Sequence, residues 1–274
     1  MTEQQVLYET AGKVGIVTLN RPEKLNALSM DLRLTMERVL READDAADTS
    51  VIVLRSEGRS FCVGFDVGAD GYDPGKVPWR YDALKFHQRL SISLRTLMTP
   101  WMLRKPVIAS VQGHCLGGGC ELVMMCDLTI AADDALFGEP EIRFSNVGPV
   151  LVMPFIIGLK RARELLYFGD PIDAKTALQY GMVNRVVPRA ELAAATMKVA
   201  RRMALISPEA LAATKLAINR GADAAGFRNA MQAGIDVVAP LYAATTEASA
   251  EFRARAEKDG LPAALKWRKA QFEE

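Results

Sequence analysis

Glu121 and Glu141 are the residues of this chain whose type and spacing best suit proton transfer. Each ends a glycine-containing stretch, 117–121 (Gly-Gly-Gly-Cys-Glu) and 137–141 (Phe-Gly-Glu-Pro-Glu), and twenty positions separate them. Glycine lets a ligand oxygen approach backbone N–H groups closely, and two carboxyls near each other cannot both easily ionise. The pattern therefore predicts a site that stabilises an enolate and moves protons around it.

The glycine turn before Glu121 predicts an oxyanion or anion site. An apolar strand at 107–111 leads into the turn, and a helix should continue through Leu122. The first N–H groups of a helix have no partner within it, so they remain available to a ligand. A dinucleotide-binding turn fits poorly, because Gly117-x-Gly119 would need a small residue where Leu122 stands. A purely structural turn remains an alternative.

Short apolar runs and amphipathic stretches must position these residues. The runs at 14–19, 51–54, 107–111 and 128–131 predict strands, most of them buried on both faces, and a helix should begin after Ser29. Strands that alternate with helices indicate an α/β architecture with parallel strands in its core.

A long excursion separates the second and third of these runs. Residues 56–78 are rich in Gly, Asp and Pro and predict a loop, and a helix should follow and end before Pro106. Apolar side chains of this excursion either wall a pocket or, as is commoner at helical spacing, belong to the core. They are Trp79, Phe86, Met98, Trp101 and Met102.

Composition narrows the class of protein. The 274 residues are 50% hydrophobic and carry a formal net charge of +1, so a sizeable core is expected and the charge pattern of a nucleic-acid binder is absent. The polar N-terminus lacks the pattern of a signal peptide, and no run reaches the roughly 20 apolar residues of a membrane span. We expect a cytoplasmic enzyme. The chain has two histidines, and its four cysteines lack the paired spacing of a zinc site, so we expect no metal site.

The last third of the chain predicts helices only, at 190–205, 207–221, 225–244 and 247–258. We therefore divide the chain into a core at 1–190 and a helical region at 191–274. Apolar stripes without an independent core commonly pack against a partner subunit, so we expect a homo-oligomer.

The chain resembles the enoyl-CoA hydratase/isomerase family, also called the crotonase family. The resemblance implies a crotonase-like spiral of β-β-α units with a C-terminal helical oligomerisation region, assembled as a homotrimer or a dimer of trimers. It extends from near the start to about residue 190 and continues more loosely through the C-terminal helices. The matching stretches are 19–28, 61–66, 105–127, 137–142, 169–174 and 181–188.

The resemblance also implies roles for individual residues. The N–H groups of Phe65 and Gly118 form an oxyanion hole for the thioester oxygen of an acyl-CoA. Because only the N–H group is used, phenylalanine is compatible with a position where alanine is common, although its ring should narrow or reshape the pocket. Glu121 accepts a proton from the water that attacks the β-carbon, and Glu141 delivers a proton to the α-carbon. Glu139 should lie behind this pair or on the surface.

Contacts with coenzyme A are implied for Lys24, for Val63 and Asp66, and for Lys269. Either lysine alone would more often be merely solvated. Coenzyme A is part of the substrate, and neither a metal nor another cofactor is expected.

One stretch departs from the family pattern. Hydratases of the family follow the second glutamate with a glycine-rich run, whereas 145–158 carries bulky apolar residues that either belong to the core or crowd the acyl pocket. The other stretches match the family, and on these the sequence predicts an enoyl-CoA hydratase. Double-bond isomerisation, dehydration and thioester hydrolysis remain alternatives, as does a non-catalytic relative that binds CoA or RNA.

Overall fold

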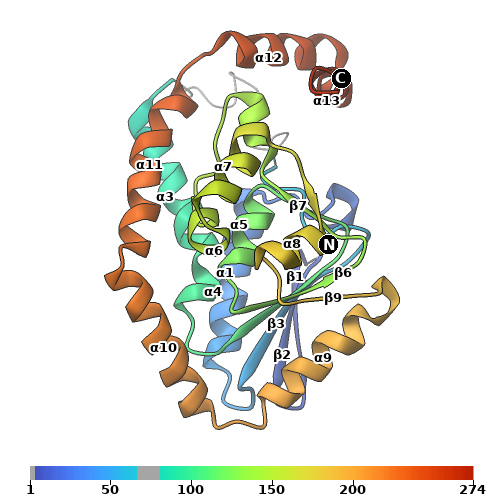
Figure 1. Ribbon diagram of the computed structural model, residues 1–274, viewed down its shortest axis with the longest axis vertical. Coiled ribbons are helices and arrows are strands. Elements are labelled where there is room, and N and C mark those ends of the chain that lie inside the picture. The colour runs from blue at the N-terminus through green and yellow to red at the C-terminus, as the bar shows by residue number, and fades with distance from the viewer. Residues whose placement is uncertain (1–3, 67–80, 274) are drawn as a thin grey trace.

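The computed structural model describes residues 4–66 and 81–273 (Figure 1). Strands are β1 (Val6–Ala11), β2 (Val14–Leu19), β3 (Val51–Ser56), β4 (Val107–Val111), β5 (His114–Leu116), β6 (Leu128–Ala132), β7 (Leu136–Gly138), β8 (Ile172–Asp173) and β9 (Arg185–Val187). Helices are α1 (Met30–Asp45), α3 (Ala83–Leu97), α4 (Thr99–Met102), α5 (Gly118–Met124), α6 (Met153–Ile157), α7 (Leu159–Phe168), α8 (Ala174–Tyr180), α9 (Leu192–Met203), α10 (Pro208–Ala224), α11 (Phe227–Ala243), α12 (Glu247–Asp259) and α13 (Leu261–Ala270). Short 3-10 turns are η1 (Pro22–Lys24), η2 (Pro140–Phe144) and η3 (Arg189–Glu191).

Two sheets organise the chain. The larger has the order β1-β2-β3-β4-β6-β9, and all its pairs except β1–β2 are parallel. The smaller has the order β5-β7-β8, in which β5 and β7 run parallel. The four predicted strands are confirmed as β2, β3, β4 and β6, and the α/β spiral class is confirmed with them.

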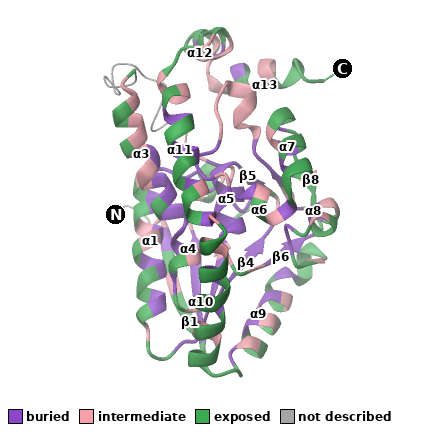
Figure 2. Cartoon of the chain, turned by 60° about the vertical axis from the view of Figure 1, so that its left-hand side comes forward, coloured by how far each residue is buried: buried purple, intermediate pink, exposed green. Residues whose placement is uncertain are grey.

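Both faces of the larger sheet are covered by helices. Alternate residues of β3 point to opposite sides: Ile52 and Leu54 join a core with α1 and α5, whereas Val53 joins a second core with α9. Figure 2 shows buried residues gathered along the sheet and on the inner sides of these helices. Each apolar side chain buried in this way stabilises the fold by about 1.5–3 kcal/mol.

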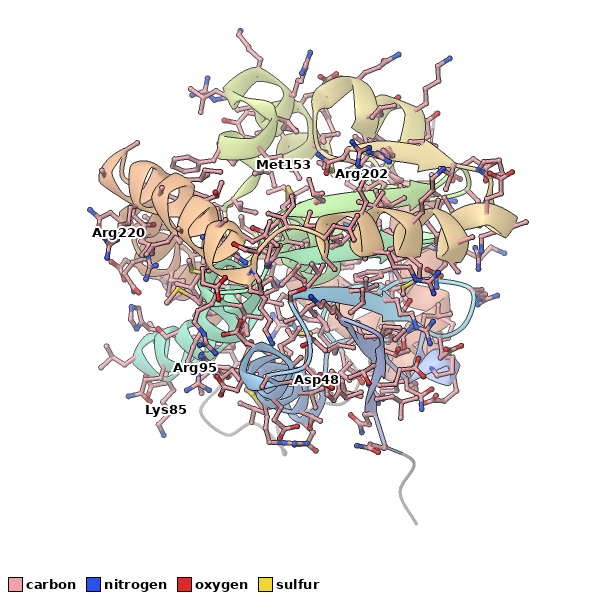
Figure 3. The ribbon with its side chains drawn as sticks, turned by 90° about the horizontal axis from the view of Figure 1, so that it is seen from below. Asp48, Lys85, Arg95, Met153, Arg202 and Arg220 are labelled. Atoms are coloured by element: carbon pink, nitrogen blue, oxygen red, sulfur yellow. The ribbon has the colours of Figure 1, made fainter. Side chains whose placement is uncertain are left out.

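The C-terminal third is helical, as predicted, and α13 is its last helix. Helix α11 packs along α3, and α12 contacts η2 at the end of the molecule opposite α10 (Figure 1). Charged side chains labelled in Figure 3, such as Arg95 and Arg220, are exposed, whereas Met153 is fully buried. None of the helices described has the length and apolarity needed to cross a membrane. The division at residue 190 stays a prediction.

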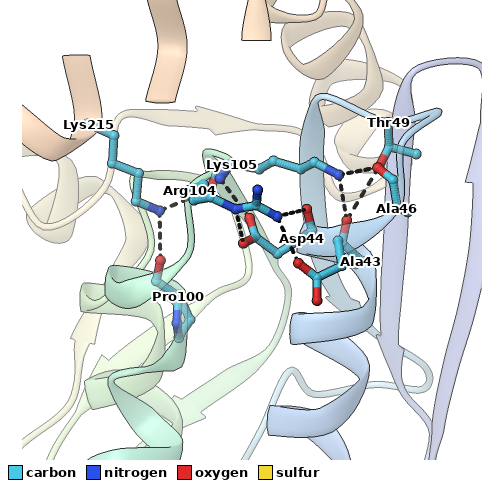
Figure 4. Close-up of polar contacts among 9 residues, drawn as sticks. Ala43, Asp44, Ala46, Thr49, Pro100, Arg104, Lys105 and Lys215 are labelled. Carbon is cyan, nitrogen blue, oxygen red and sulfur yellow. Dashed lines mark hydrogen bonds and ion pairs between the residues drawn. The ribbon is translucent and has the colours of Figure 1, made fainter. Parts of the chain in front are cut away.

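A buried lysine ties α10 to the start of β4 (Figure 4). Lys215 Nζ donates to the carbonyls of Pro100 and Lys105, at 2.7 and 3.0 Å, and pairs with Asp127 Oδ2 at 2.7 Å. The same Asp127 oxygen accepts the N–H of Val107 at 2.7 Å. Because β4 leads towards the glycine turn, this network fixes the element that enters the site.

Of the four apolar residues of the excursion that the structure describes, two pack into or against the core. Met98 is buried, and Trp101 stacks on Phe227 with ring centroids 4.3 Å apart. Phe86 contacts the Tyr242 ring, and Met102 is exposed. Trp79 lies outside the described residues.

Candidate active site

Position 117 of the glycine turn requires glycine, because neither its backbone conformation nor its neighbours accommodate a side chain. Gly117 has φ +52°, a left-handed value that favours glycine, and a Cβ there would lie 2.0 Å from Glu141 Oε1. Its N–H donates to the carbonyl of Gly138 at 2.8 Å, and its carbonyl accepts the N–H of Glu121 at 3.0 Å. The turn therefore places Glu141 against the start of α5 and Glu121 one turn into that helix.

The N–H groups of Phe65 and Gly118 have no hydrogen-bond acceptor within residues 4–66 and 81–273. Gly118 is the first residue of α5, so its N–H has no partner inside the helix. The backbone of Gly64 packs on the turn, since a Cβ there would lie 3.6 Å from Gly117 Cα. Donors brought together without acceptors are what an oxyanion hole requires.

The Phe65 ring lies directly on the glycine turn. A Cβ at Gly118 would lie 2.8 Å from Phe65 Cε2 and 3.1 Å from Leu28 Cδ1. The buried guanidinium of Arg33 lies 5.1 Å from the centre of the same ring, a cation–π distance. Packing on these sides holds Phe65 in place and so orients its N–H.

Glu121 is fully buried in α5. Its Oε1 accepts the N–H of Val150 at 2.6 Å, and its Oε2 has no hydrogen-bond partner among the residues described. Burial raises the pKa of Glu121 well above its ordinary value, and the negative charges of Glu139 and Glu141 raise it further. A carboxyl in this setting favours the protonated form in the free protein.

Glu141 stands on η2, the turn that follows β7. Its Oε2 has no hydrogen-bond partner in the described chain, and burial raises its pKa to about 7. Glu141 is thus poised to exchange a proton near neutral pH, and it interacts electrostatically with Glu121. The two carboxyls share their protons as one set.

The apolar run after Glu141 belongs mainly to the core. Val150, Val152 and Met153 are fully buried, whereas Phe155 is about half exposed. The run also contributes a hydrogen bond, because the backbone N–H of Val150 donates to the Glu121 carboxylate. Crowding of the acyl pocket by this run stays a prediction.

Glu139 does not lie on the surface, which corrects one of the two expectations for it. Its side chain is 2% exposed, and both its carboxyl oxygens lack hydrogen-bond partners in the part of the chain described. A signal for this burial is present in the sequence: Glu139 follows the buried Phe137 by two positions, and such residues share one face of a strand. The site therefore contains a third buried carboxyl.

A small cavity of about 10 Å3 adjoins the carboxyls and has room for about one water molecule. It is lined by Glu139, Glu141, Ile142, Asn146, Val147, Gly148 and Leu166.

Three of the residues expected to contact coenzyme A lie near the oxyanion site. Val63 and Asp66 belong to the loop that carries Phe65, and Asp66 pairs with Arg21 at 2.5 Å. Lys24 is exposed at the end of the adjacent η1. Lys269 lies on α13, where it is exposed. Across residues 4–66 and 81–273, no group of three His, Cys, Asp or Glu side chains is arranged to hold a metal ion.

Comparison with known proteins gives concordant matches along the whole chain. The family model described as enoyl-CoA hydratase/isomerase matches residues 9–273. A relative from Clostridium acetobutylicum named short-chain-enoyl-CoA hydratase is 33% identical over 99% of this chain and 98% of its own length. A relative from Syntrophomonas wolfei named crotonyl-CoA hydratase is 32% identical over 99% of both chains.

Solved structures match the fold equally completely. A crystal structure of an enoyl-CoA hydratase/isomerase from Xanthobacter autotrophicus Py2 is 35% identical, with a TM-score of 0.93 over 100% of both chains. An enoyl-CoA hydratase from Mycobacterium smegmatis is 28% identical, with a TM-score of 0.90 over 98% of this chain and 94% of its own.

Proposed function

This chain belongs to the enoyl-CoA hydratase/isomerase family, and we propose that it is an enoyl-CoA hydratase, which adds water across the 2,3 double bond of an enoyl-CoA thioester. One observation carries the proposal: the N–H groups of Phe65 and Gly118, which have no acceptor among the described residues, lie beside the fully buried Glu121 and the half-buried Glu141. The relatives' names favour a short acyl group. The proposed compartment is the cytoplasm.

The backbone donors stabilise the intermediate. When water adds to the β-carbon of the thioester, negative charge moves onto the thioester oxygen and an enolate forms. The N–H groups of Phe65 and Gly118 donate to that oxygen without reorganising, because the turn and the Phe65 packing fix them beforehand.

The carboxyls move the protons. In the expected division of roles, ionised Glu121 takes a proton from the attacking water while the water oxygen bonds to the β-carbon. Protonated Glu141 then gives a proton to the α-carbon. One proton is gained by the carboxyl set and one is lost, so the set resets by an internal transfer. Because the carboxyls titrate as one coupled set, the reverse division of roles is equally compatible with the site.

Substitution of each carboxyl by its amide tests the proposal. The parent should hydrate trans-2-enoyl-CoA thioesters of varied length, and the absorbance of the conjugated thioester should fall as it does so. The kcat of Glu121→Gln and of Glu141→Gln should each be about 10²–10⁴-fold lower. Exposed Glu164→Gln is the matched control and should retain parent activity. Absence of turnover by the parent on every thioester would refute the hydratase proposal. Undiminished turnover by both variants would refute the catalytic role of Glu121 and Glu141.

Isotope exchange separates the two divisions of roles. A saturated acyl-CoA cannot be hydrated, but its α-proton can exchange with deuterium oxide through the same enolate. If Glu141 handles the α-proton, Glu141→Gln abolishes exchange and Glu121→Gln retains part of it. The opposite result assigns the α-carbon to Glu121.

Coenzyme A should contact Lys24, Val63, Asp66 and Lys269. The first three flank the loop of Phe65. Lys269 is more distant in sequence and stands on α13 of the C-terminal region.

A further inference from the structure

Glu139 is a buried carboxyl that the proposed reaction does not use. Its Oε2 and Glu121 Oε1 approach the same point, because a Cβ at Gly148 would lie 2.8 Å from the first and 2.3 Å from the second. Glu139 also shares the small cavity with Glu141. It therefore lies close to both carboxyls that we assign to proton transfer.

The surroundings of Glu139 are acidic on each side. Glu121 and the Cys120 thiol face it from α5, and Glu141 faces it from η2. Of the residues in the described chain, no lysine, arginine or histidine forms an ion pair with any of these carboxyls. Ionising all of them at once is therefore strongly unfavourable, because like charges in a buried site repel.

The carboxyls should lose their protons in sequence. Burial raises the pKa of Glu121, Glu139 and Glu141, and repulsion between the carboxylates raises the pKa values further. Because each negative charge disfavours the next one, the three protons leave in separate steps, and a charge on Glu139 opposes loss of the last proton from the other two.

We propose that Glu139 is a positioning residue that keeps a proton on the catalytic pair: once ionised, it prevents the remaining acid of Glu121 and Glu141 from losing its proton. This inference rests on the proposed function and extends it. The working site thus retains one base and one acid over a wider range of pH than two carboxyls alone would allow.

The pH profile of Glu139→Gln tests the role, because glutamine resembles the neutral carboxyl and cannot ionise. The alkaline limb of kcat/KM should move to lower pH by about one unit or more, while the acidic limb stays in place. Glu164→Gln, an exposed change of the same kind, should move neither limb. A uniform loss of rate at every pH would show a structural role only and overturn the proposal. Glu139→Leu serves equally if the glutamine variant does not fold.

A second measurement does not depend on turnover. A carboxyl whose pKa is raised by folding binds more protons in the native state, so its contribution to stability is lost as pH rises through that folded pKa. The unfolding temperature of Glu139→Gln should therefore fall less steeply than the parent's between about pH 5 and pH 9. A constant difference across that range would overturn the proposal, even if no enoyl-CoA is ever found to react.

Discussion

Gly148 leaves no room for a side chain between Glu121 and Glu139. An alanine Cβ at this position would press on an oxygen of each. Gly148→Ala should therefore displace the carboxyls and lower kcat/KM by about 10²-fold, since small misplacements of catalytic groups have large effects. Gly221→Ala is the control, because nothing lies within 4 Å of a Cβ there and alanine favours the helix. Parent-like activity of Gly148→Ala would contradict the close packing.

The acidic limb of the pH profile reports the first ionisation of the coupled carboxyls. Because burial raises the pKa of Glu141 to about 7, the set carries no charge below that pH, and neither Glu121 nor Glu141 is available as a base. We expect kcat/KM to rise about tenfold per pH unit below this value and to level off above it. Steady-state rates on a crotonyl thioester across the range measure this directly. A profile that stays flat down to about pH 5 would show that Glu141 ionises normally.

For single residues, the sequence singled out the glutamates that stand in motifs and left the position of Glu139 open between two alternatives. Glu121 and Glu141 stand beside glycines in a recognisable order. Glu139 resembles a polar turn residue, and its burial depends on which face of a three-residue strand it continues. The hydrogen bond from Val150 could not be foreseen either, because it joins residues on separate elements.

Among the elements, η2 carries Glu141 and is held from outside by the C-terminal helices. Arg268 Nε donates to the carbonyl of Arg143, and the ring of Phe144 meets that of Phe252 with centroids 4.9 Å apart. A turn this short has little stability of its own. The C-terminal helices should therefore fix the direction of the Glu141 side chain.

Arg268→Ala tests this support. Loss of its hydrogen bond should loosen η2 and lower kcat by about tenfold, with a smaller change in KM. Arg255→Ala is a matched control: Arg255 stacks on Trp267 at 4.1 Å but makes no contact of this kind with η2. Equal effects of the two substitutions would show that general destabilisation is responsible.

The sequence predicted long elements better than short ones. The four strands and the C-terminal helices have clear periodicity, and each appears within a few residues of its expected bounds. Strands β5, β7 and β8 have two or three residues, too few to show an alternating pattern. Their pairing comes from the spiral itself, which brings distant segments together.

The whole molecule exposes apolar side chains along its C-terminal helices. Ile218 is 65% exposed and Val237 75%. Burial of such surface between subunits is the simplest account of the proposed trimer or dimer of trimers. Light scattering after size exclusion should give three or six times the 30.0 kDa protomer mass. A monomer at micromolar concentration would contradict this prediction.

The Lys215–Asp127 pair has an evolutionary consequence. Removal of Asp127 leaves the buried Lys215 ammonium without its counter-ion. Losing one partner of a fully buried pair costs about 3–5 kcal/mol, and the cost is lower here because the Asp127 side chain is 25% exposed, whereas replacing both by apolar residues is often tolerated. Here the loss would fall on the start of β4, the strand that precedes β5 and the glycine turn. Through descent, positions 127 and 215 should therefore change together rather than singly, although 88 residues separate them.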